Sequence, residues 1–171
     1  MASVIITTER LNLRLMTVQD AGNLLQIFSD PIAMHYYPST MDEAATIGWI
    51  RRTLDNYDTY GVGFWVVEEK ASGRFLGQCG MIPQELDGSP IMEIAYLLVR
   101  REWGQGYATE AAMAVKQYGF ETMGYPKLVS LIDRHNTPSI RVAERVGMQH
   151  ERTITKWGKP VLVYTASPRH G

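Results

Sequence analysis

Cysteine is almost absent from this sequence, since Cys79 is the only one in 171 residues. An intramolecular disulfide framework is therefore excluded, and a reducing compartment is favoured. Apolar runs that approach the roughly 20 residues needed to span a bilayer are missing too, and residues 1–8 carry no signal-peptide pattern. We therefore expect a cytoplasmic protein that has no membrane partner.

An excess of charge of either sign is also lacking, because 17 Lys and Arg face 18 Asp and Glu for a formal net charge of -1. A protein that binds a nucleic-acid backbone needs many more basic than acidic side chains, so no nucleic-acid partner is expected. The histidines, at positions 35, 135, 150 and 170, have no ligand spacing, and no metal is predicted. The composition is that of a soluble globular chain, and we expect one domain over residues 1–171. A homodimer is left open.

Hydrophobic periodicity predicts the elements of the first half of the chain. Leu11, Leu13 and Leu15 alternate with polar residues, which indicates a half-buried strand over residues 9–16. The other elements expected before residue 83 are two helices, an aromatic loop and two strands. The first helix runs from a capping-box pattern at 17–20 to 30, and the aromatic loop follows at 34–38. The second helix is capped within 40–43, carries apolar residues to 54 and is ended by Gly61 and Gly63, and the strands are at 64–69 and 75–82, with Pro83 as an interruption.

The second half is organised around residues 92–123, which read as strand, glycine turn and helix. An apolar run over 92–99 is of strand length, Gly104 and Gly106 permit a tight turn, and a helical period begins at Ala108. A further strand is expected at 127–133, then a short helix with Thr137 as N-cap and Pro138 in its first position, and finally a hairpin over 150–166. The total is about seven strands and four helices.

The glycine turn is the first candidate site. A strand-to-helix turn leaves unpaired N–H groups at the helix start, and these donors together with the helix dipole favour a bound phosphate. A dinucleotide-binding unit with Asp133 as the ribose acid is a poor match, because Thr109 stands at the third glycine position and only 38 residues follow Asp133. An ordinary structural turn is the other alternative.

The order of several motifs along the whole chain resembles the GNAT superfamily of acyl-CoA N-acyltransferases. Within it, the chain is similar to the branch of bacterial acetyltransferases that act on the N-termini of ribosomal proteins. The motifs are Arg101-x-x-Gly104-x-Gly106, Tyr107-Ala108-Thr109-Glu110-Ala111, Asn136-x-x-Ser139 and Val146-Gly147-Met148, with Thr8-Glu9-Arg10-Leu11 and Tyr36-Tyr37-Pro38 earlier in the chain. The resemblance implies a mixed α/β fold with a mostly antiparallel, twisted sheet.

The resemblance also implies a cofactor, acetyl-CoA, and a set of residues that bind it. Backbone N–H groups of the glycine turn would wrap the pyrophosphate, and the preceding strand, splayed from its neighbour at a bulge, would pair with pantetheine and supply an N–H to the oxyanion. Asn136 would contact pantetheine as well. The implied binding residues are Leu97, Leu98, Val99, Arg101, Gly104, Gln105, Gly106, Tyr107, Ala108, Thr109, Asn136 and Ser139.

Two residues are candidates for proton transfer in an N-acetyltransferase that moves the acetyl group directly to a primary amine. Glu93 lies on the same strand face as Ala95 and Leu97, an unusual place for a carboxylate, and is the first candidate for the base. A strand-end Glu that reaches solvent is the competing interpretation. Ser139 stands where many members of the superfamily have a tyrosine acid, and it can equally be a helix-start hydroxyl without a proton role. The acceptor would be a peptide N-terminus or a small-molecule amine.

Other interpretations remain open from the sequence alone. A non-catalytic CoA-binding or regulatory module on the same fold is the alternative to an enzyme. Glu110 is a weaker candidate base because an acidic residue in a first helical turn is already explained by the dipole. Arg134 and Arg141 can meet the 3′-phosphate of coenzyme A or only solvent. Cys79 is expected to be a packed thiol.

Overall fold

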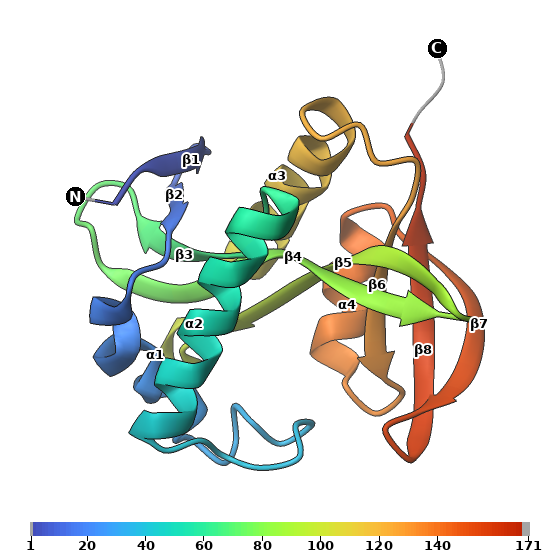
Figure 1. Ribbon diagram of the computed structural model, residues 1–171, viewed down its shortest axis with the longest axis horizontal. Coiled ribbons are helices and arrows are strands. Elements are labelled where there is room, and N and C mark those ends of the chain that lie inside the picture. Colours follow the sequence, from blue (N-terminus) through green and yellow to red (C-terminus); the bar gives the residue numbers. More distant parts are fainter. Residues whose placement is uncertain (1, 169–171) are drawn as a thin grey trace.

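The computed structural model describes residues 2–168, which form an open eight-stranded sheet with helices on both faces (Figure 1). The strand order is β1-β2-β3-β4-β5-β6-β8-β7, and every neighbouring pair is antiparallel except β5 with β6. The strands are β1 (Val4–Thr7), β2 (Leu11–Leu15), β3 (Phe64–Glu69), β4 (Phe75–Leu86), β5 (Ser89–Leu98), β6 (Leu128–Asp133), β7 (Gln149–Lys156) and β8 (Lys159–Ala166). The helices are α1 (Ala21–Phe28), α2 (Glu43–Tyr60), α3 (Tyr107–Glu121) and α4 (Thr137–Arg145), with 3-10 turns η1 (Val18–Asp20) and η2 (Arg100–Glu102).

Two buried clusters of apolar side chains hold the helices to the sheet. On one face Leu24 and Phe28 of α1 and Ile50 of α2 pack with Val66. On the other face the larger cluster joins α3 and α4 to the sheet, and α3 can lie close because its inner positions are small. Gly119 shows this, since a Cβ there would lie 2.8 Å from the sulfur of Met81. The layered, mostly antiparallel α/β architecture predicted from the sequence is confirmed.

The sheet divides between β5 and β6. These parallel strands pair only at Met92 with Leu128 and at Glu93 with Val129, and then they separate. The separation needs no bulge, because β5 keeps an unbroken register with β4 from Ser89 to Leu98, so the expected bulge is wrong. The Ser130 hydroxyl donates to the carbonyl of Ile94 (2.7 Å) where the ladder stops. The β5 edge beyond this point is therefore open toward α4.

Two strand predictions need correction. Strand β1 was missed, because Val4–Thr7 is short and pairs with β2 through an irregular register. Pro83 does not interrupt β4, which continues to Leu86 with Pro83 opposite Met92. Hydrogen-bonded pairs alternate along an antiparallel ladder, so the N–H that proline lacks would face β3. Since β3 pairs no further than Gly80, the proline removes no ladder bond there.

The N-terminal caps of the helices lie where the sequence predicts them, except that the cap of α4 is shifted by one residue. The capping box of Thr17 and Asp20 is confirmed, although it starts the η1 turn that leads into α1. For α2 the cap is Asp42, whose side chain accepts from the Ala45 N–H. For α4 the N-cap is Asn136 and not Thr137, because the Asn136 side chain accepts from the Ser139 N–H at 3.3 Å.

The parallel doubly wound sheet of a dinucleotide-binding protein is excluded by this topology, since β5 and β6 form the sole parallel pair in the described sheet. Between residues 2 and 168, no helix has the length and apolar character to cross a bilayer.

Candidate functional site

A cleft of about 930 Å³ lies where β5 separates from β6. Three parts of the chain that are distant in sequence form its walls: the end of β5 with the glycine turn, the start of α4, and the loop after α1. Nine of the binding residues implied by the resemblance line it, namely Leu97, Leu98, Gly104, Gly106, Tyr107, Ala108, Thr109, Asn136 and Ser139. Val99, Arg101, Gln105 and Glu93 do not line it.

The glycine turn presents an open helix start to the cleft. Gly104 and Gly106 have φ of 80° and 79°, in the left-handed region that favours glycine. Gly106 is the N-cap of α3 and supplies no side chain, so the first N–H groups of the helix have no side-chain acceptor. These donors and the positive end of the dipole make the turn suited to an anionic group.

Hydrogen bonds and ion pairs between side chains brace the turn. Glu102 is 5% exposed and accepts both arms of Arg74, at 3.0 and 3.2 Å. Gln105 donates to the same carboxylate at 3.3 Å, and Arg101 reaches Gln26 of α1 at 2.8 Å. The side chains of Arg101 and Gln105 are therefore engaged within the protein and do not enter the cleft.

Along the open edge of β5, Leu98 is the residue of the 97–99 segment whose backbone faces away from β4. The Val99 N–H donates to the Leu76 carbonyl at 2.9 Å, and by alternation Leu97 also faces β4. The Leu98 carbonyl is occupied by the Trp103 indole N–H at 3.0 Å. Backbone groups from Leu97 to Val99 were expected to be free. In the part of the chain that the structure describes, the Leu98 N–H is the one that remains available on this edge.

Glu93 is buried, with 6% of the residue exposed, so the solvent-reaching interpretation is wrong. Its carboxyl accepts from the Leu131 N–H (2.7 Å) and from the Gln84 amide (3.0 Å). Burial raises the pKa of Glu93 to about 7, against the opposing effect of these two hydrogen bonds and of the Lys156 charge. A carboxyl with such a pKa can exchange a proton near neutral pH.

Ser139 lies in the first turn of α4 with both backbone groups engaged. Its N–H is bonded to Asn136, and its carbonyl accepts from the Tyr96 hydroxyl at 2.7 Å. Among residues 2–168 the Ser139 hydroxyl has no hydrogen-bond partner and is free to meet a ligand. Tyr96, which also lines the cleft, was missed from the sequence. Tyr96 lies on the strand that leads to the glycine turn, and this position could have marked it as a candidate site residue.

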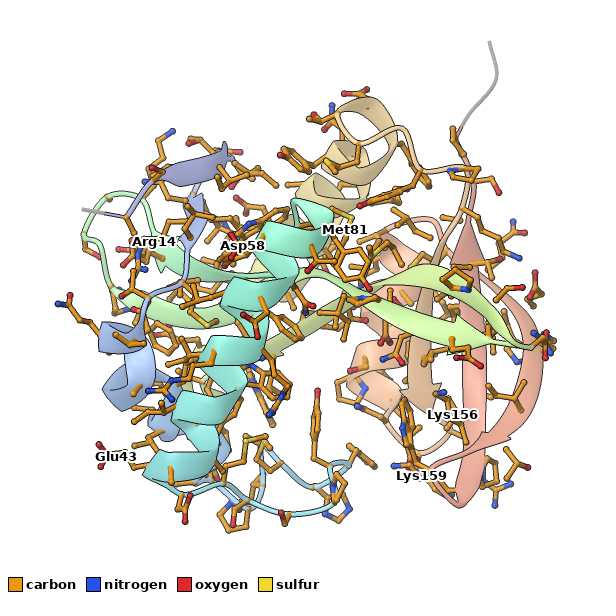
Figure 2. All side chains as sticks on the ribbon, viewed as in Figure 1. Arg14, Glu43, Asp58, Met81, Lys156 and Lys159 are labelled. Atoms are coloured by element: carbon orange, nitrogen blue, oxygen red, sulfur yellow. The ribbon has the colours of Figure 1, made fainter. Side chains whose placement is uncertain are left out.

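The loop of residues 31–37 closes the third wall. Its Tyr36 hydroxyl donates to the His135 carbonyl (2.9 Å), and Lys159 donates to the Tyr36 carbonyl (3.0 Å) while pairing with Asp133 (2.8 Å). Figure 2 shows Lys159 on the C-terminal hairpin, on the side that faces this loop. The loop is thus fastened across the cleft to the opposite half of the sheet.

Most of the other residues considered from the sequence do not line the cleft. Cys79 is fully buried, and burial raises the pKa of its thiol, which fits a packed side chain. Of the two arginines considered for a phosphate, Arg141 lines the cleft and Arg134 does not. The described residues contain no group of three or more His, Cys, Asp or Glu able to hold a metal ion. His170 lies outside the described residues.

Comparison with known proteins identifies the family of the chain. The family model described as "Acetyltransferase (GNAT) domain" matches residues 10–149, which include β2 to the start of β7. All three walls of the cleft fall within this range.

Similar proteins span nearly the full chain. The uncharacterized protein YkkB of Bacillus subtilis (strain 168) is 44% identical and aligns over 93% of each chain. An uncharacterized N-acetyltransferase, p20 of Bacillus licheniformis, is 31% identical over 89% of this chain and 86% of its own. RimL, a ribosomal L7/L12 alpha-N-protein acetyltransferase solved in complex with coenzyme A, superposes with a TM-score of 0.79 over 96% and 98% of the two chains. At 15% identity, that last likeness shows the fold alone.

Proposed function

Because this chain belongs to the GNAT acetyltransferase family, we propose that it transfers an acetyl group from acetyl-CoA directly to a primary amine within a ternary complex. The observation that carries the proposal is the cleft, which joins the uncapped start of α3 to the open edge of β5 in one continuous space. A phosphate-bearing thioester needs both features, an anion site at one end and free backbone groups along an extended arm.

The residues present fit coenzyme A. The N–H groups at Gly106, Tyr107 and Ala108 would meet the pyrophosphate, the β5 edge and Asn136 would pair with the pantetheine arm, and Arg141 would lie near the 3′-phosphate. RimL, which has the same fold, is bound to coenzyme A in its solved structure. Acetyl-CoA supplies the activated acyl group, and no metal is needed.

In the proposed reaction, the amine nitrogen attacks the thioester carbonyl carbon and the carbon–sulfur bond then breaks. The Leu98 N–H would stabilise the oxyanion, a type of donor worth roughly 3 to 4 kcal/mol. Glu93 would take the proton from the amine through water, because its carboxyl does not line the cleft. The Ser139 hydroxyl would donate a proton to the departing thiolate, whose conjugate acid has a pKa of about 8.5, and would regain one from the water to which Glu93 returns the amine proton.

The charge of the cleft walls favours an acceptor with one amine. Glu102 is the only carboxylate in the cleft lining, it is held by Arg74, and two arginines line the same space. The wall formed by residues 31–37 contributes His35, Tyr36 and Tyr37 and no acidic side chain. A polyamine or an aminoglycoside needs several carboxylates, so a peptide N-terminus or a small monoamine fits better. A peptide α-amine, with a pKa near ~8, also needs less help from a base than a lysine.

Thermal unfolding and thiol release test the proposal. Millimolar acetyl-CoA should raise the Tm, whereas NAD or ATP at the same concentration should not. Thiol release should then be measured with N-terminal peptides, amino acids, polyamines and aminoglycosides, and should be fastest with acceptors that carry one amine. No stabilisation by acetyl-CoA would refute the cofactor assignment.

A non-catalytic CoA-binding module is the second candidate, favoured by the structural use of Glu93. Its carboxylate bonds the Leu131 N–H at the point where β6 leaves β5, which explains a buried carboxyl without any chemistry. Binding of acetyl-CoA without turnover for any amine in the panel would support this candidate over the enzyme.

A further inference from the structure

Arg10 contacts the glycine turn at three points, although it precedes the turn by 95 residues. Its Nη1 donates to the Gln105 carbonyl at 3.0 Å, and its guanidinium carbon lies 4.5 Å from the centre of the Tyr107 ring. Its Nε donates to Glu110 Oε1 at 2.6 Å. Arg10 stands just before β2 and is not part of the cleft lining, so it contacts the turn from outside the cleft.

The bond to Gln105 determines where the next N–H points. In a trans peptide the C=O and N–H of one unit point in opposite directions, and the described chain has no cis bonds. With the Gln105 carbonyl held by Arg10, the Gly106 N–H is aimed away from Arg10, and Gly106 lines the cleft. Glycines on both sides of Gln105 leave this peptide free to rotate, so an external anchor is needed.

The bond to Glu110 balances an unfavourable charge. Glu110 lies in the first turn of α3, where an ionised carboxylate would repel a bound phosphate. Burial alone would raise the pKa of Glu110, but hydrogen bonds from the Thr8 hydroxyl (2.6 Å) and from the N–H and Nε of Arg10 (3.0 and 2.6 Å) lower it. The carboxylate therefore stays ionised, and the guanidinium balances its charge.

We propose that Arg10 is a positioning residue for the phosphates of coenzyme A, acting by orienting the Gly106 N–H and by neutralising Glu110. This inference rests on the proposed function, because it presumes that the turn holds those phosphates. It assigns a task to a residue of the Thr8-Glu9-Arg10-Leu11 segment that takes no part in the chemistry itself.

The test compares acetyl-CoA with S-acetylpantetheine, which keeps the thioester arm and lacks the nucleotide phosphates. In Arg10→Met, the KM and Kd for acetyl-CoA should rise about tenfold at similar kcat, whereas kcat/KM for S-acetylpantetheine should stay within twofold of the wild type. Equal losses with both donors, or no loss with acetyl-CoA, would overturn the proposal. Arg52→Met is the matched control, because Arg52 also lies over an aromatic ring, that of Trp49, on α2 away from the turn.

A second pair of variants separates the two parts of the proposal and guards against misfolding. Arg10→Met/Glu110→Gln should recover about threefold of the lost affinity, since the unpaired charge is gone while the Gln105 carbonyl stays unanchored. No recovery would contradict the neutralising role, and full recovery would contradict the orienting role. Arg10→Lys keeps the charge and should lie between wild type and Arg10→Met. Failure of the wild-type protein to bind acetyl-CoA would instead refute the proposed function.

Discussion

The glycine turn, residues 102–109, and the loop of residues 31–37 both line one cleft and are stabilised in different ways. The turn is braced from behind by two ion pairs, Arg74 with the buried Glu102 and Arg10 with Glu110. The loop is held by two hydrogen bonds, from the Tyr36 hydroxyl to the His135 carbonyl and from Lys159 to the Tyr36 carbonyl. Just before the loop, Asp30 pairs with Arg100. The turn offers backbone groups to a ligand, and the loop offers side chains.

This difference matches the two roles proposed for these segments, binding of the same donor by the turn and choice of the acceptor by the loop. Backbone N–H groups bind an anion whatever the side chains are, so the turn depends on two glycines and on braces that hold their conformation. In the proposed reaction, the side chains of the loop would decide which acceptor fits, and a surface loop can change without altering the donor site. Glu93 lies on β5 outside the cleft lining and would serve the proposed chemistry through water.

The largest effect is expected at Glu93, the proposed base, which belongs to neither region. Glu93→Gln should lower kcat about 100-fold, because a general base contributes on the order of 10²- to 10⁴-fold. Only the ionised carboxyl accepts a proton, so the wild-type rate should rise with pH through about 7, the raised pKa of this group. The variant should lose that limb of the pH profile, as measured by thiol release.

Glu85→Gln is the matched control, since Glu85 is exposed on the same hairpin and outside the cleft. A Glu93→Gln variant that keeps the wild-type rate and the wild-type pH limb would leave Glu93 with a structural role alone.

A substitution in the turn should affect the donor and spare the acceptor. Gly106→Ala places a side chain at φ of 79°, which costs roughly 1 to 2 kcal/mol, and puts its Cβ 3.4 Å from Nη2 of Arg10. The KM for acetyl-CoA should rise about tenfold while the acceptor KM is unchanged. Gly88→Ala has nearly the same φ, 76°, at the β4–β5 hairpin and should lose stability without any change in KM. A rise in the acceptor KM alone would contradict the assignment of the two walls.

The smallest effect is expected in the loop. There the KM for the acceptor should change while the KM for acetyl-CoA should not, the reverse of the result expected in the turn. Tyr36→Phe removes the hydrogen bond to the His135 carbonyl, and a typical bond contributes about 0.5 to 1.5 kcal/mol. The acceptor KM should rise about threefold and the KM for acetyl-CoA should stay constant in steady-state kinetics. Tyr60→Phe, at the exposed end of α2, provides the control. A change confined to acetyl-CoA would show that the loop serves the donor.

Local patterns were sufficient to predict most elements, because alternation, helical periods and caps act within a few residues. They were insufficient where the effect of a residue depends on a distant strand. Pro83 is harmless because β3 has already ended beside it, and the end of β3 does not follow from the sequence near Pro83. The cap of α4 was misplaced for a different, local reason, because Asn136 and Thr137 are both suitable cap residues and it is the Asn136 side chain that reaches the Ser139 N–H.

By itself, the sequence determined the family resemblance, the order of the helices and of the strands from β2 onward, and the glycine turn, since the left-handed backbone at Gly104 and Gly106 favours glycine. The tertiary structure decided the pKa of Glu93, because burial where β5 meets β6 raises it to about 7. It also decided that Arg10 meets Gln105 and Glu110. Burial and long-range hydrogen bonds exist only once residues distant in the chain lie side by side, and local patterns in the sequence do not contain them.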